Sequence, residues 1–151
     1  MTELDKKREL VAYRLTQSKE TLEEAMFLLE GGKSLRVVTH RAYYIMCYAI
    51  LALLIDEPFA SSKHSGVLSY FNRRFVGEGV FPKDIGRLIN RAFELRQQGD
   101  YRENAQLTLE QVQPLVEAAT TFIELVTSYL EAQGRLLVLH QTISSEDEVI
   151  N

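Results

Sequence analysis

The sequence has little cysteine, proline or glycine, and each shortage excludes a class of protein. One of its 151 residues is a cysteine, Cys47, which excludes a disulfide framework and a zinc site built from several thiolates. Three prolines and eight glycines are too few for a β-sandwich with many turns, and they favour long helices. The hydrophobic share of 46% and the charged share of 25% exclude wholesale disorder.

Strong positive charge and long apolar runs are also missing. A net charge of −4 and a pI near 5.4 exclude a dominant basic surface for duplex DNA. The longest apolar run, residues 42–55, is shorter than the ~20 residues that cross a bilayer, and Arg41 and Asp56 border it closely. The first ten residues lack the apolar core of a signal peptide. We expect a cytoplasmic protein without membrane contact, whose apolar run is the central helix of a bundle.

Five helices are predicted from hydrophobic periodicity and from residues that begin or end helices. Ser34 and Ser62 are N-cap candidates, and Thr108 with Gln111 is typical of a capping box. Pro114 predicts a kink in the last helix or a later start. The predicted helices cover residues 4–30, 35–56, 63–76, 82–99 and 108–132, and the first one places Leu4, Val11, Leu15, Leu22, Ala25, Met26 and Leu29 on its apolar face.

These helices predict an all-α fold, an up-and-down antiparallel bundle over residues 1–133. The remaining residues, 134–151, contain an acidic run and are predicted to form a loosely held tail.

The second predicted helix carries a polar seam. His40, Arg41, Tyr44 and Tyr48 project into one arc of roughly 100° on a helix that is otherwise mostly aliphatic. Such groups require hydrogen-bond partners when buried. Two interpretations remain open. Either these side chains form hydrogen bonds within the protein and have a structural role, or they contact a ligand.

The fourth predicted helix places an arginine on its core side. Arg96 projects onto the apolar face, where a cation requires a carboxylate or a ligand anion as a partner. Asp100 is four residues further along, and Tyr101 follows it. These three residues are the best candidate site in the chain. The alternative is a buried Arg96–Asp100 pair that only orients the following turn.

The start of the third predicted helix is a weaker candidate. Lys63 and His64 stand at a helix N-terminus, where free backbone N–H groups can hold a phosphate. Ordinary capping and solvation is the alternative. We expect no metal and no cofactor, because there is no glycine-rich phosphate loop and no histidine has a glutamate three residues before it. Cys47 is expected to be a buried thiol with a raised pKa.

Three short motifs resemble the HEPN domains (higher eukaryotes and prokaryotes nucleotide-binding), specifically their small prokaryotic single-domain branch. They are His40-Arg41-Ala42-Tyr43-Tyr44, Lys63-His64-Ser65-Gly66-Val67, and Leu95-Arg96 followed after three residues by Asp100-Tyr101. They occur in the expected order on a five-helix pattern over residues 4–132.

The resemblance implies a helical bundle that is commonly a homodimer and is often encoded beside a minimal nucleotidyltransferase in toxin–antitoxin-like pairs. It also implies a nucleotide or RNA ligand, with Arg41, Tyr44, Lys63, His64, Arg96, Asp100 and Tyr101 as the binding residues.

Many HEPN proteins are metal-independent endoribonucleases with an arginine, four to six residues, and then a histidine. This chain has Tyr101 at the fifth position after Arg96, and a phenol is a poor base at neutral pH. A ribonuclease would therefore need His40 or His64 as its acid–base group, with Arg96 and Tyr101 beside it. Three hypotheses follow: a phosphate-binding module paired with a nucleotidyltransferase, an endoribonuclease toxin acting in a dimer cleft, and a helical interaction scaffold.

Overall fold

The computed structural model describes residues 2–59, 63–101 and 106–137, apart from the side chains of His64, Asp100 and Tyr101. All its regular elements are helical within these ranges, which confirms the predicted all-α class. Most of the predicted acidic tail, residues 138–151, lies outside the described residues. In chain order the elements are α1 (Glu3–Glu30), α2 (Leu35–Leu54), α3 (His64–Phe71), the π-helical turn η1 (Asn72–Val76), α4 (Lys83–Tyr101) and α5 (Leu109–Ala132).

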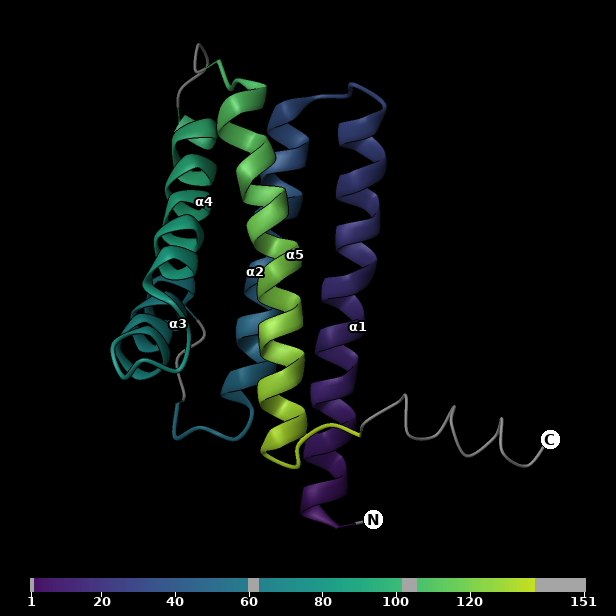
Figure 1. Ribbon diagram of the computed structural model, residues 1–151, viewed down its shortest axis with the longest axis vertical. Coiled ribbons are helices and arrows are strands. Elements are labelled where there is room, and N and C mark those ends of the chain that lie inside the picture. The colour runs from purple at the N-terminus through teal and green to yellow at the C-terminus, as the bar shows by residue number, and fades with distance from the viewer. Residues whose placement is uncertain (1, 60–62, 102–105, 138–151) are drawn as a thin grey trace, which may run out of the picture.

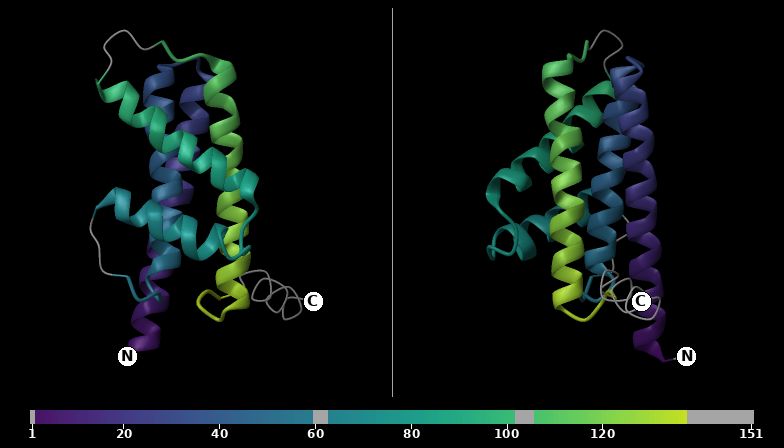
Figure 2. Two further views of the ribbon diagram at one scale, coloured as in Figure 1. Left: turned by 90° about the vertical axis from the view of Figure 1, so that its left-hand side faces the viewer. Right: turned by 45° about the vertical axis from the view of Figure 1, so that its right-hand side comes forward.

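Three long helices form the body of the molecule. α1, α2 and α5 run side by side, and α2 is in contact with both of the others (Figure 1). The side view in Figure 2 shows α3 and α4 crossing this trio obliquely, against α2 and α5. α2 begins and α4 ends at the same end of the bundle (Figure 1), which allows residues early in α2 to meet residues late in α4.

α2 is the core helix, as the sequence predicts. By length and composition it could cross a membrane, yet 67% of its most apolar window is buried inside the molecule. Its backbone comes close to α1, where the Ser18 hydroxyl donates a hydrogen bond to the Ile45 carbonyl over 2.7 Å. The burial of α2 by its neighbours is that of a core helix in a bundle.

Local end signals set most of the helix boundaries correctly. The Ser34 side chain accepts a hydrogen bond from the Val37 N–H, which confirms the predicted N-cap of α2. Thr108 and Gln111 form the predicted capping box, each side chain accepting from the other residue's backbone N–H. Of the two alternatives predicted at Pro114, the later start of α5 is wrong, since this capping box fixes the start of the helix before the proline; the kink stays a prediction.

Two expectations for the third helix need correction. The stretch predicted as one helix from Lys63 is divided into α3 and η1. The N-cap is Lys63 instead of the predicted Ser62, and its side chain makes no capping hydrogen bond. The wider π-helical turn is closed by the Gly77 N–H donating to the Asn72 carbonyl over 2.7 Å. Phe71 at the end of α3 and Phe75 in η1 are both fully buried in the core.

Two residues predicted on the apolar face of α1 are exposed. Leu4 lies near the free N-terminal end of the helix, and Met26 borders a surface hollow between α1 and α5. Periodicity selects the correct side of the helix but does not show where the neighbouring helices end.

Candidate functional site

The guanidinium group of Arg96 joins α4 to α2. Its central carbon lies 4.4 Å from the centre of the Tyr43 ring and 5.6 Å from the centre of the Tyr44 ring. Tyr43 is buried, whereas Tyr44 and Arg96 are half-buried. Cations are attracted to the faces of aromatic rings at such distances, so both tyrosines stabilise the charge and fix the plane of the guanidinium group.

Arg96 differs from its neighbours on α4 in its pairing. Arg87 forms an ion pair with Asp84 at 3.0 Å and Arg91 with Glu94 at 3.1 Å. Arg96 has no carboxylate at ion-pair distance among the described side chains, and its buried Nε has no hydrogen-bond partner there. The predicted core-side arginine is therefore present, and its contacts with described side chains are aromatic rather than acidic.

Further aromatic and thiol groups surround this contact. The Tyr43 ring packs edge-on against Phe93 at 4.6 Å, and the Tyr44 ring stacks with Tyr48 at 6.0 Å. Burial raises the pKa of the Cys47 thiol to about 11, although the charge of Arg96 opposes this shift. Burial also raises the pKa of Tyr43 well above its usual range. Both groups are therefore protonated at neutral pH and serve as packing groups.

The polar seam of α2 is divided between two neighbouring helices. Arg41 points towards α1, where it lies 3.6 Å from the Glu24 carboxylate. Tyr44 instead meets Arg96 of α4. Arg41 therefore contacts α1 and not Arg96. His40, half-buried one helical turn before Tyr44, is the histidine of α2.

The other predicted site residues are placed less completely. Lys63 stands exposed at the start of α3, which lies well below the end of α4 in Figure 2. The side chains of His64, Asp100 and Tyr101 are outside the part of the chain that the structure describes. Their assignment as ligand contacts, and the alternative Arg96–Asp100 pair, stay predictions.

Tyr43 belongs to this site, although the sequence did not predict it as a site residue. It is buried against both Arg96 and Phe93, so it fixes the relative position of α2 and α4. Its signal in the sequence is its place in the His40-Arg41-Ala42-Tyr43-Tyr44 motif. Adjacent aromatic residues on a helix point about 100° apart, so such a pair can hold a side chain from a neighbouring helix between them.

The chemistry available at this site is anion binding. A guanidinium group stacked on rings keeps its outer N–H donors for a planar or tetrahedral anion, such as a phosphate. Among the described residues no group of three or more His, Cys, Asp or Glu side chains is arranged to hold a metal ion.

Comparison with known proteins assigns the fold to a family. The family described as "HEPN domain" matches residues 11–129. The chain belongs to the HEPN family. The match covers α2, α3, η1 and α4 completely and most of α1 and α5, and it includes both sides of the Arg96–Tyr43 contact.

Several known proteins are similar to this chain along most of their own length. A UPF0332 protein of Thermotoga maritima is 34% identical over 85% of this chain and 96% of its own. Two proteins of Methanocaldococcus jannaschii, each named "Putative toxin", are both 30% identical. One match covers 82% of this chain and 91% of the relative, and the other covers 89% and 90%.

Proposed function

We propose that this HEPN protein binds the phosphate group of a nucleotide or of RNA through Arg96. The observation that carries the proposal is a half-buried guanidinium group held over two tyrosine rings, with no described carboxylate to neutralise it. No described side chain offsets the desolvation of this cation, and a bound phosphate would do so through charge-assisted hydrogen bonds.

The tyrosines beside Arg96 fit the rest of such a ligand. Tyr44 and Tyr48 are half-buried and stacked along α2, and the Tyr44 ring lies beside the guanidinium group of Arg96. Exposed rings beside a positive charge are the usual elements for binding single-stranded nucleic acid, with bases stacking on the rings and phosphate on the cation. Lys63, His64, Asp100 and Tyr101 remain proposed additional contacts.

The test is a titration of the purified full chain with fluorescent ATP and with a labelled single-stranded RNA. Arg96→Ala is expected to weaken binding at least ten-fold, because charge-assisted bonds to phosphate contribute about 1.5–3 kcal/mol. Arg87→Ala is the matched control, since Arg87 is an exposed arginine of the same helix. Equal binding by wild type and Arg96→Ala, with both proteins folded by circular dichroism, would reject the site.

The partners of this module are proposed on the resemblance and on the toxin names of the Methanocaldococcus relatives. We propose that the protein is a homodimer in the cytoplasm and forms a toxin–antitoxin-like pair with a minimal nucleotidyltransferase. Light scattering of the purified chain gives its oligomeric state. Co-expression with a nucleotidyltransferase encoded beside it, followed by size-exclusion chromatography, tests the pair.

A metal-independent endoribonuclease is the second candidate function. It is favoured by the names of the two toxin-like relatives and by the place of His40, one turn from the tyrosine that contacts Arg96. An imidazole with Arg96 would supply acid–base catalysis and stabilise the charge of the phosphorane transition state. RNA cleavage in excess chelator that is lost in Arg96→Ala would support it. Full activity in the His40→Ala, His64→Ala double variant would exclude it.

A further inference from the structure

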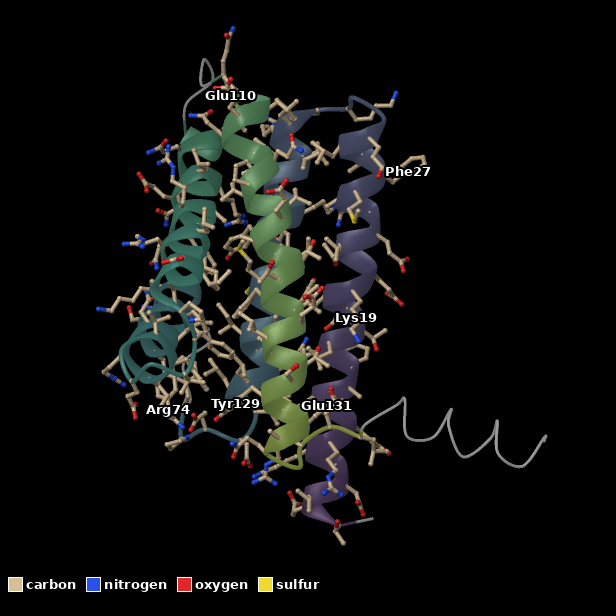
Figure 3. The ribbon with its side chains drawn as sticks, viewed as in Figure 1. Lys19, Phe27, Arg74, Glu110, Tyr129 and Glu131 are labelled. Carbon is tan, nitrogen blue, oxygen red and sulfur yellow. The ribbon has the colours of Figure 1, made fainter. Side chains whose placement is uncertain are left out.

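A line of glutamates runs along α5 on the side away from its core residues. Glu110, Glu117, Glu124 and Glu131 are spaced seven residues apart, and α5 contains no lysine, arginine or histidine. A seven-residue step is almost two helical turns, so all four lie within about 60° around the helix. Figure 3 shows Glu110 near one end of α5 and Glu131 near the other. None of the four has an ion-pair partner among the described side chains.

Beside this line, the surface between α1 and α5 contains an apolar hollow of about 400 Å³. Met26 and Leu109 border it with 43% and 51% of their surface exposed, and Leu29 and Val116 also line it. The charged residues that line it are Glu30 and Glu117, both acidic and exposed. Exposed apolar side chains inside a charged rim are typical of an interaction site.

The acidic residues that line the hollow, and the glutamate line beside it, restrict what can cover it; the exposed Lys19 of α1 does not line the hollow (Figure 3). A two-fold dimer through this face would place the glutamate line of one copy against that of the other. The C-terminal residues Glu146, Asp147 and Glu148 are acidic as well, and so are the phosphates of nucleic acid. Each of these occupants brings like charges together, which costs free energy. A complementary partner must be cationic and must also carry apolar side chains.

We propose that this hollow binds a basic amphipathic helix of another protein. The lining residues of α5 extend from Leu109 to Thr120, a distance of about 16 Å along the helix. That length matches about three turns of a helix, whose apolar side chains at positions i, i+3 or i+4, and i+7 would enter the hollow. Lysine or arginine side chains flanking this apolar stripe would reach Glu30 and Glu117.

The interaction is independent of Arg96, which lies on α4 in contact with α2. The phosphate site and the hollow therefore use different helices, α2 and α4 for the first and α1 and α5 for the second. A protein that binds through the hollow can remain attached while Arg96 holds its ligand.

The probe is a fluorescent 14-residue helical peptide made only of leucine and lysine, with its leucines on one face. Binding to the full chain is measured by fluorescence anisotropy. Glu30→Gln and Glu117→Gln are each expected to weaken binding roughly two- to five-fold. Glu20→Gln is the matched control, because Glu20 is an exposed glutamate of α1 that does not line the hollow. A peptide with glutamate in place of lysine is expected not to bind.

Methionine methyl NMR locates the peptide on the molecule. The methyl resonance of Met26, at the edge of the hollow, is expected to shift on binding, whereas that of Met46, which is fully buried in α2, is expected to stay in place. The proposal is overturned if the lysine peptide does not bind, if Glu20→Gln weakens it as much as Glu117→Gln, or if Met26 does not shift. Equal binding of the acidic peptide would also overturn it.

Discussion

The guanidinium carbon of Arg96 lies 4.4 Å from the centre of the Tyr43 ring, so a cation of α4 rests on a buried aromatic residue of α2. The contact holds the arginine in one orientation before any ligand arrives, which lowers the entropy cost of binding. The faces of the Tyr43 and Tyr44 rings also stabilise the half-buried positive charge. In the proposed function Tyr43 is therefore a positioning residue, and Arg96 is the group that would contact the ligand.

Replacing Arg96 by methionine separates a binding role from a structural one. Arg96→Met keeps an unbranched side chain over Tyr43 but removes the charge, so the lost cation–π attraction is offset by relief of a costly desolvated cation. The free energy of unfolding in urea is expected to change by less than about 1 kcal/mol, while RNA and nucleotide binding is lost. A stability loss above about 2 kcal/mol with unchanged binding would instead favour the scaffold hypothesis.

Cys47 is expected to make stability fall in alkaline solution. Burial raises the pKa of its thiol from 9.0 to about 11, so the folded state holds the proton more tightly than the unfolded chain does. The resulting stabilisation is complete below pH 9 and is lost as the pH rises towards 11, by roughly 1 kcal/mol between pH 8 and 10. Urea unfolding at several pH values should show a flatter pH dependence for Cys47→Ala. Parallel curves for the two proteins would contradict the assignment.

The side chains of Asn72 and Asn90 form a reciprocal amide pair that attaches η1 to α4. Each Nδ2 donates to the other Oδ1, at 3.0 and 3.1 Å, and Asn90 also donates to the Gly86 carbonyl at 2.6 Å. Asn90→Ala leaves partly buried polar groups unsatisfied and is expected to cost about 1–2 kcal/mol. A double-mutant cycle with Asn72→Ala measures the pair directly. A coupling energy near zero would show that the two amides act independently.

The aromatic cluster that packs α3 and the turn after η1 against α5 is expected to provide much of the packing energy. Phe122 is fully buried, with its ring centre 5.4 Å from that of Phe71 and 5.7 Å from that of Phe81. Phe122→Ala is expected to cost about 3–5 kcal/mol in denaturant unfolding. Phe27→Ala is the control, because Phe27 is 75% exposed and its truncation should change stability by less than about 0.5 kcal/mol. Similar losses for both variants would contradict this account of the core.

Local signals along the chain were enough to predict the order and approximate bounds of the five α-helices. These depend on neighbours along the chain, such as the Thr108–Gln111 capping box, and on a repeat of apolar residues that each helix carries in itself. The resemblance to HEPN domains likewise rested on short motifs, and the match over residues 11–129 confirms it.

Which side chains meet depends on how the helices pack against one another, and local signals did not predict it. Helical periodicity places Arg41 and Tyr44 in one arc, but it does not show that α1 takes the first and α4 the second. In the same way, Met26 counts as apolar in the sequence, although the spacing of α1 and α5 leaves it exposed at the edge of a hollow. The physical reason is that such contacts depend on the angle and distance at which whole helices cross. These are set by many contacts between residues far apart in the sequence, not by the residues of one segment.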